Sequence, residues 1–217
     1  MSNRKLWLAF IAVMVGSFAV LGYYGVEIYR KAPPVPERVV TTERAVVMTG
    51  QEIKDGQNVW QSLGGQEVGT VWGHGSYVAP DWSADWLHRE SMYLLNRWAQ
   101  QDFAKRFKDL DDEVQASLKV RLQKELRTNS YNLETGELVI SPLRAAAFQA
   151  IGNHYSGLFT DDPDKSALRE AYAIPENSIK DSGRLKPLNA FFFWTSWASS
   201  TNRPGKTVDK GLQVANL

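Results

Sequence analysis

The distribution of apolar and polar positions separates one long uncharged segment from a series of shorter amphipathic ones. Residues 6–26 form a run of 21 residues without a charge. At about 1.5 Å per residue, a helix of that length spans roughly 31 Å, the thickness of the hydrocarbon core of a bilayer. Trp7 lies near one end and Tyr23 and Tyr24 near the other, as interfacial aromatic residues do. Because the apolar region of a signal peptide is shorter, we predict an uncleaved membrane anchor over residues 1–30.

The polar region that follows predicts a stiff neck and then several helices. Three prolines within residues 33–36 favour an extended neck, assigned to residues 31–48. Thr49 and Glu52 form a capping-box pattern, which predicts a helix that ends at Gly64-Gly65. Apolar positions at helical spacing, together with breaker residues, predict three further helices over about 81–107, 112–127 and 142–159.

Two later segments depart from this amphipathic pattern. Residues 130–141 alternate around the turn Glu134-Thr135-Gly136 and predict a small β-hairpin. Residues 188–200 are apolar and aromatic but too short to span a bilayer, so they form either a buried helix or a helix at the membrane surface. We therefore expect a mainly α protein, with the main domain over 49–187 and an aromatic, membrane-proximal segment and tail over 188–217.

Composition excludes several classes of function. The chain has no cysteine, which excludes disulfides, thiolate metal sites and covalent haem attachment through a CxxCH motif. The formal net charge is +1, and the Lys and Arg residues are scattered, which argues against a nucleic-acid partner. The only histidines are His74, His88 and His154, and no two of them have i, i+4 spacing. We expect ordinary hydrogen-bonded or surface roles for them rather than a metal site.

Two other groups of residues invite a chemical interpretation. Asp81 and Asp85 lie one helical turn apart and could form an acid–base pair. Aspartate at a helix start more often caps the helix, and we expect that role. The glycine-rich stretch from Gly64 to Gly75 has neither a P-loop nor a GxGxxG pattern, so phosphate binding is not expected. Backbone carbonyls in such a loop can coordinate a hard cation such as Ca²⁺.

The run GQNVWQ…GHGSYVAPDWSADWLHRE over residues 56–90, with NAFFFWTSWASSTNRPG over 189–205, resembles the N-terminal region of quinol-dependent nitric oxide reductases. In that family a part similar to the small subunit of the cytochrome c-dependent relatives is fused to the catalytic subunit. This sequence keeps the positions Gly56, Val59-Trp60-Gln61, Gly73, Gly75, Tyr77 and Ala79-Pro80-Asp81 of the small-subunit pattern. On that register the two haem cysteines fall at Gly65 and Val68, and the haem-ligating histidine falls at Gly69.

The resemblance implies a haem-free, cytochrome c-like domain on the periplasmic side of a bacterial cytoplasmic membrane. It implies an enzyme that reduces two NO to N2O and water with electrons from quinol. The catalytic core of the family resembles haem–copper oxidases and holds two b-type haems and a non-haem iron. That core is absent from this chain, so we expect no catalytic residue here, no activity of the chain alone, and a structural role that covers the outer face of the core. The chain would be a fragment, a truncated product or the small half of a split enzyme.

The resemblance also implies one metal site. In the family, main-chain oxygens at the positions of Gly75 and Tyr77 contribute to a Ca²⁺ site whose remaining ligands come from the core. Apart from this candidate calcium site, no cofactor is expected in this chain. The alternative function, from a different class, is a membrane-anchored interaction or assembly domain that catalyses nothing.

Overall fold

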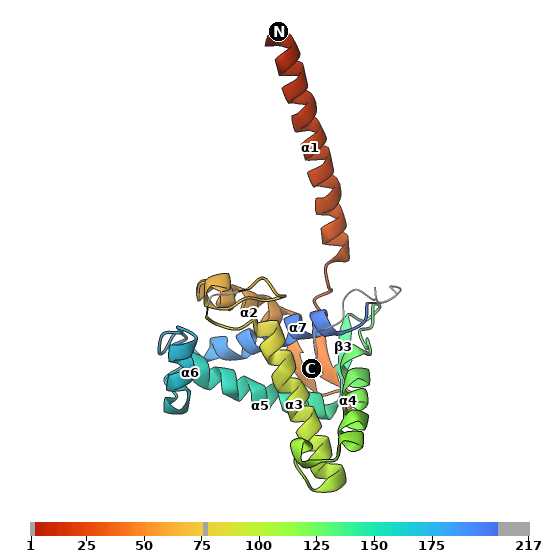
Figure 1. Ribbon diagram of the computed structural model, residues 1–217, viewed down its shortest axis with the longest axis vertical. Coiled ribbons are helices and arrows are strands. Elements are labelled where there is room, and N and C mark those ends of the chain that lie inside the picture. Colours follow the sequence, from red (N-terminus) through yellow and green to blue (C-terminus); the bar gives the residue numbers. More distant parts are fainter. Residues whose placement is uncertain (1–2, 76–77, 204–217) are drawn as a thin grey trace. The chain divides into compact units, whose positions relative to one another are not determined.

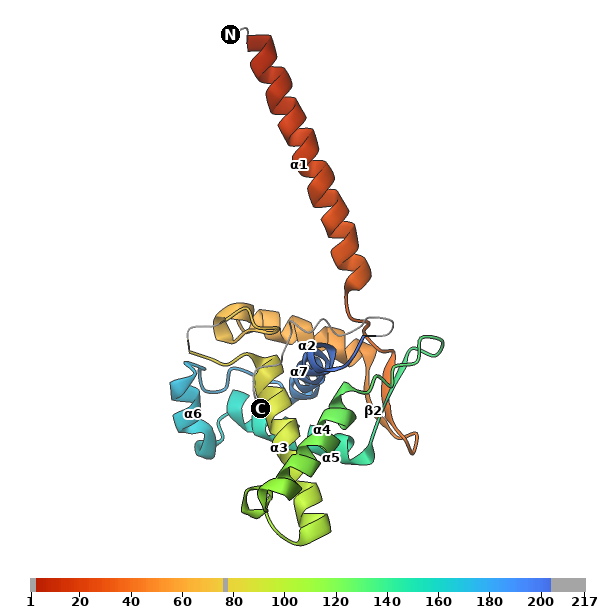
Figure 2. The same cartoon turned by 45° about the vertical axis from the view of Figure 1, so that its right-hand side comes forward.

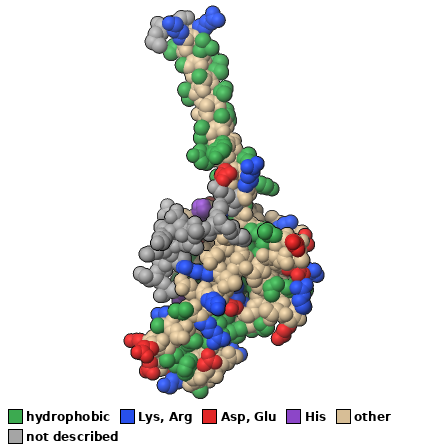
Figure 3. Space-filling model, turned by 90° about the vertical axis from the view of Figure 1, so that its right-hand side faces the viewer, with side chains coloured by type: hydrophobic (Ala, Val, Ile, Leu, Met, Phe, Trp, Pro, Cys, Tyr) green, Lys and Arg blue, Asp and Glu red, His purple; other side chains and the backbone are tan. Residues whose placement is uncertain are grey.

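The computed structural model describes residues 3–75 and 78–203, and the chain separates into two compact units at Pro34/Val35. The first unit is the helix α1 (Asn3–Lys31). Its apolar side chains point outward on the face seen in Figure 3, with Lys and Arg at its N-terminal end. The stretch Asn3–Arg30 has the length and composition needed to cross a membrane. The predicted apolar helix is therefore confirmed.

The second unit contains a three-stranded sheet of order β2-β1-β3, formed by β1 (Arg38–Thr41), β2 (Val46–Thr49) and β3 (Glu137–Ile140). β1 and β2 are antiparallel neighbours, whereas β1 and β3 pair in parallel. The hairpin expected over residues 130–141 contributes one isolated antiparallel bridge, between Tyr131 and Leu138. Its second strand pairs mainly with β1, because this pairing places Leu138 and Ile140 in the buried core.

The sheet includes part of the segment assigned to the proline neck, where the β-branched residues favour strands. β1 and the start of β2 lie inside residues 31–48, and Val39 and Met48 are fully buried. Among these residues, Pro33–Pro36 have no regular secondary structure. Consecutive buried residues in both strands, among them Val39, Val40, Val47 and Met48, join this segment to the folded unit.

Six helices complete the second unit among the residues that the structure describes. They are α2 (Gly50–Ser62), α3 (Trp82–Phe103), α4 (Asp112–Arg127), α5 (Pro142–Phe159), α6 (Ser166–Ala171) and α7 (Leu185–Ser200). Short 3-10 turns occur at Gly65–Val68, Phe107–Asp109, Pro163–Lys165 and Ser182–Arg184. The predicted capping box at the start of α2 is present: the Glu52 N–H donates to Thr49 Oγ1, and the Thr49 N–H donates to a Glu52 carboxylate oxygen.

Helix α7 settles the two interpretations of the aromatic segment in favour of a buried helix. Every residue from Leu188 to Trp197 is buried. Figures 1 and 2 both show α7 lying against α2, its most extensive neighbour. The two helices approach closely at Gly56, where a Cβ atom would lie 1.9 Å from the Pro187 carbonyl oxygen. A side chain at position 56 would therefore push α2 and α7 apart.

The buried side chains form two separate clusters. The larger joins the sheet to α2, α5, α7 and the first turns of α3, and is rich in aromatic residues. The smaller lies between α3 and α4 and is mainly aliphatic, with Leu94, Leu95, Leu118, Leu122 and Leu126 among its members. Trp82 and Trp86 lie in the first cluster and Trp98 in the second, so the aromatic residues of α3 are core residues, as expected.

Candidate functional site

The glycine loop, defined here as residues 64–81, connects α2 to α3 and carries the frame of the family resemblance. Two backbone hydrogen bonds join the two ends of this loop. The Thr70 N–H donates to the Pro80 carbonyl at 3.2 Å, and the Trp82 N–H donates to the Thr70 carbonyl at 2.7 Å. These bonds hold the two ends of the loop together at Thr70 and Trp82, while Ser76 and Tyr77 lie outside the described residues.

Asp81 holds this loop to the start of α3. One carboxylate oxygen accepts the Ala84 N–H at 3.0 Å, which caps the helix. The other accepts the Gly73 N–H at 2.5 Å and the Thr70 hydroxyl at 3.2 Å. The predicted capping role of Asp81 is confirmed, and the same side chain also sets the conformation of the loop.

Asp85 has different partners and does not form a pair with Asp81. Its Oδ2 accepts the Tyr155 hydroxyl at 2.6 Å and Arg89 Nε at 2.7 Å. Burial, together with the Asp85 carboxylate, raises the pKa of Tyr155 well above its ordinary value. The tyrosine therefore stays protonated and donates to Asp85, an arrangement that ties α3 to α5 rather than one poised for acid–base chemistry.

The three positions that the family resemblance assigns to haem attachment do not fit a haem. At Gly69, the histidine position, a Cβ atom would lie 2.3 Å from Trp82 Nε1, and the backbone φ is +112°. On its other side, Trp60 Nε1 donates to the Gly69 carbonyl at 3.0 Å. Gly65 and Val68 occupy the cysteine positions, and the chain has no cysteine at all. The residues present can neither attach a haem covalently nor offer the expected axial histidine.

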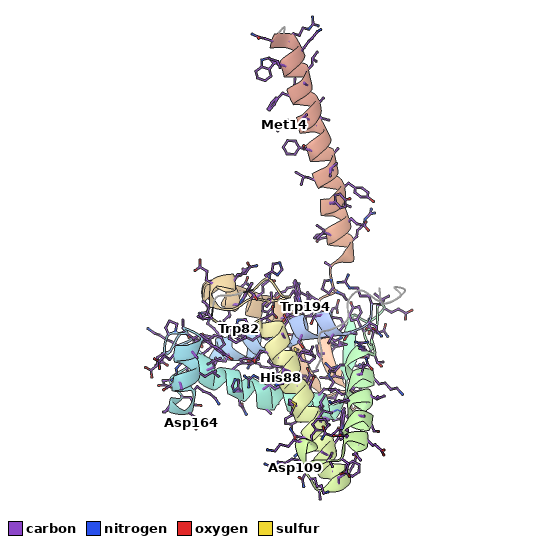
Figure 4. The ribbon with its side chains drawn as sticks, in the orientation of Figure 1. Met14, Trp82, His88, Asp109, Asp164 and Trp194 are labelled. Carbon is purple, nitrogen blue, oxygen red and sulfur yellow. The ribbon has the colours of Figure 1, made fainter. Side chains whose placement is uncertain are left out.

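The aromatic core fills the space behind Gly69. Trp82 is fully buried and stacks on Phe192, with ring centroids 5.2 Å apart and planes inclined by 19°. It also packs edge to face with Tyr155 and at a tilt against Phe159, with ring centroids 5.8 and 5.7 Å away. Figure 4 shows Trp82 at the junction between the loop and the helices. Sequence periodicity placed Trp82 in the core but gave no sign that it packs against Gly69.

The outer side of the loop exposes apolar surface. Trp72 is 44 % exposed. Its backbone has a φ of +59°, which is unusual for a residue with a large side chain. Its N–H donates to Ser83 Oγ at 3.1 Å, and its indole N–H donates to the Thr195 carbonyl at 3.0 Å. The ring also meets the edge of Trp194 at 5.5 Å. Sequence reasoning missed this anchored tryptophan, for which a tryptophan inside a glycine-rich loop was the available signal.

The calcium interpretation remains a prediction. Gly75 is exposed with φ +78°, and Tyr77 is outside the described residues. Within residues 3–75 and 78–203, no group of three or more His, Cys, Asp or Glu side chains is arranged to hold a metal. Main-chain ligation, as the resemblance implies, would not require such a group.

The three histidines lie apart in the chain and have different surroundings. His74 Nδ1 lies 3.0 Å from the Val71 carbonyl, within the loop. His88 is exposed on α3. His154 lies on α5, where burial and the nearby cations Arg89 and Lys165 lower its pKa from 6.5 to about 4.

Comparison with known proteins agrees with this geometry. Residues 36–209 match the family of NorB cytochrome c-like domains, which belong to nitric oxide reductase. No curated protein matches the chain closely enough to establish a relationship. The family match covers both strands of the neck, the glycine loop and all helices from α2 to α7. The chain therefore belongs to the family of NorB cytochrome c-like domains of nitric oxide reductase.

Proposed function

We propose that this chain is the haem-free N-terminal part of a quinol-dependent nitric oxide reductase and that it covers the outer face of the catalytic core, which lies either in the same protein or in another subunit. One observation carries the proposal. The chain matches the family, yet the Trp82 indole occupies the space that a histidine side chain at position 69 would need. A domain that has exchanged its haem ligands for packing contacts keeps a shape but has no covalent redox centre. This combination favours a structural role over electron transfer.

The electron route is consistent with the loss of haem c. A quinol is dissolved in the membrane and can deliver electrons directly to b-type haems in a membrane-embedded core. No soluble cytochrome then needs to dock on the outer domain. The chemistry, reduction of two NO to N2O and water, would belong entirely to the haems and the non-haem iron of that core.

The glycine loop is the surface that we expect to contact the core. Trp72 and Val78 expose 44 % and 53 % of their surface there, and Asp81 holds Thr70 and Gly73 through hydrogen bonds. A preorganised apolar surface loses little entropy when it binds. Main-chain oxygens of Gly75 and Tyr77 would supply part of a Ca²⁺ site at this contact, with the remaining ligands from the core.

Helix α1 would anchor the chain in the bacterial cytoplasmic membrane. It has the required length and composition, and the second unit would then lie on the periplasmic side. This placement would put the loop on the same side as the outer face of the core.

Affinity purification of the full chain from membranes of cells that make the intact enzyme tests the proposal. We expect a membrane protein with b-type haem to co-purify, and we expect the isolated chain to show no Soret band and no NO turnover. Trp72→Ala should reduce recovery of the haem protein, whereas Leu133→Ala, at a side chain that is 78 % exposed elsewhere, should not.

Several outcomes would contradict the proposal. A covalently bound haem, detected as a mass shift, would contradict the haem-free role. NO reduction by the isolated chain would contradict the structural role. A co-purified partner without haem b would instead support the alternative, an anchored assembly domain.

A further inference from the structure

A groove of about 610 Å³ lies between α3 and α4, away from the glycine loop. Its wall is mainly apolar and includes Met92, Leu95, Phe107, Leu122 and Leu126. Small-molecule sites in proteins commonly have volumes of about 300–1,000 Å³ and apolar walls with a few polar groups. The groove has the size and character of a site for a single-chain organic ligand.

A buried hydroxyl group at the groove lacks a hydrogen-bond partner. Ser91 lines the groove, is 2 % exposed, and its Oγ has no partner among the described residues. A buried polar group without a partner costs about 1–3 kcal/mol. Serine in a helix can bond to the carbonyl four residues earlier, but this hydroxyl does not. Because the Oγ atom itself is buried, the hydroxyl would reach an acceptor in the groove through a change of its rotamer.

The charge of the groove wall is of one sign. Lys119 and Arg127 contribute cations and His88 contributes an imidazole, while none of the described residues that line the groove is a carboxylate. Within the described part of the chain, neither cation has an ion pair, although Arg121 and Arg89 on the same two helices do. An anionic group would therefore find complementary charge here.

The helices place these groups in a definite order. α3 and α4 are joined by a short connection and run in opposite directions (Figures 1 and 2), and Arg121 of α4 contacts Trp98 and Asp102 in the second half of α3. His88 and Ser91 in the first half of α3 therefore lie at the same end of the groove as Arg127 at the end of α4. Figure 4 shows His88 on this part of α3. Leu95 and Phe107 lie toward the other end.

We propose that this groove binds a single-chain amphipathic carboxylate. The carboxylate lies at the end formed by His88, Ser91 and Arg127, where it accepts hydrogen bonds from the serine hydroxyl and the guanidinium. The hydrocarbon chain runs along Met92 and Leu95 toward Phe107. This site is independent of the glycine loop and of the proposed role in nitric oxide reduction.

A fluorescent reporter at the lip of the groove tests the proposal. Because the chain has no cysteine, Val120→Cys introduces a unique attachment point at a groove residue that is 65 % exposed. Leu133→Cys, which is exposed outside the groove, provides the control. With the full chain in nanodiscs of zwitterionic lipid, dodecanoate should change the emission at position 120 and leave position 133 unchanged.

The head group and its partners are then tested separately. Dodecanol, with the same chain and no charge, should bind roughly tenfold more weakly than dodecanoate. Arg127→Gln should weaken dodecanoate binding about fivefold, whereas Lys124→Gln, in the same last turn but outside the groove, should have no effect. Ser91→Ala should weaken dodecanoate binding while leaving the melting temperature equal or higher, because it removes an unpaired buried hydroxyl.

Four results would overturn the proposal. The first is no response at position 120. The second is equal affinity for dodecanoate and dodecanol, and the third is an Arg127→Gln variant that binds like the parent protein. The fourth is a reporter that responds without dodecanoate, either to protein concentration or to nanodiscs of anionic lipid, because the occupant would then be a second copy of the chain or a membrane lipid.

Discussion

The two halves of α3 lie in different cores. Trp82 and Trp86 in the first half are enclosed by aromatic rings from α5 and α7, and both are fully buried. Leu94, Leu95 and Trp98 in the second half pack on α4 beside an open groove. One helix thus borders a closed cluster of rings at its first turns and an open apolar groove along its middle.

The difference separates a part of the domain that is closely packed with aromatic rings from a part that borders an open groove. At the closed end, large rings occupy the volume behind the loop, and Gly69 has no room for a side chain. Along the middle of α3, the wall of the groove is mainly aliphatic and open to solvent. Close packing in the aromatic core makes it sensitive to lost volume, whereas walls beside a groove can relax.

Removing the central ring of the aromatic core should have the largest effect. Trp82→Ala should lower the free energy of unfolding by about 3–5 kcal/mol, because neighbouring rings hold one another in place and cannot collapse into the space. Urea unfolding of the full chain, followed by circular dichroism, measures this loss. A loss below that of Leu122→Ala would show that the aromatic core is the more adaptable of the two.

Adding a single methyl group at the haem-histidine position should have the next largest effect. Gly69→Ala should cost about 2–4 kcal/mol, because its Cβ meets the Trp82 indole and its backbone has a positive φ. Gly65→Ala is the matched control: its φ is also positive, but its Cβ would meet nothing within 4 Å. The control should cost only about 1 kcal/mol. Equal costs in the same urea assay would remove the argument that Trp82 excludes a side chain.

Truncation in the aliphatic cluster should be milder. Leu122→Ala should cost about 2–3 kcal/mol, at the low end for a buried leucine, because the side chain borders the groove. Val120→Ala, on the exposed lip of the groove, should stay within about 0.5 kcal/mol of the parent protein. A cost for Leu122→Ala equal to that for Trp82→Ala would contradict the contrast between the two cores.

The smallest expected effect is the loss of stability at acidic pH that arises from His154. The pKa of His154 is about 4 in the folded chain, against 6.5 for the free side chain. Between these values the unfolded chain binds a proton that the folded chain excludes. The free energy of unfolding is therefore undiminished by this group above pH 6.5 and falls as the pH drops from 6.5 to 4.

His154→Gln should remove this contribution, so the variant should lose less stability than the parent protein between pH 6.5 and 4. Urea unfolding at several pH values compares the two slopes. Parallel slopes would show that burial of His154 does not contribute to acid sensitivity.

Local patterns in the sequence predicted local structure well. The apolar run predicted α1, the Thr49 capping box predicted the start of α2, and Asp81 was expected to cap α3; each is present. These features depend on residues within a few positions of one another, so the sequence displays them directly. The family resemblance likewise rested on contiguous motifs, and the family match confirms it.

Contacts between distant residues could not be predicted in this way. The parallel pairing of β1 with β3, the contact of Trp82 with Gly69 and the anchoring of Trp72 on Thr195 all depend on how helices and strands pack. Periodicity identifies a buried face but does not name its partner. The candidate calcium ligands Gly75 and Tyr77 were chosen by resemblance, and main-chain ligation leaves no side-chain signature.

The parallel pairing of β1 and β3 also affects the order in which the domain is made. Arg38 and Glu137, which pair across these strands, are 99 residues apart in the chain. At a synthesis rate of roughly 5–20 residues per second, β3 is completed about 5–20 s after β1. The aromatic core forms later still, because α7 is synthesised after β3. During that interval the hairpin of β1 and β2 presents an open strand edge, so a newly made chain has a period in which a chaperone or another nascent chain can pair with it.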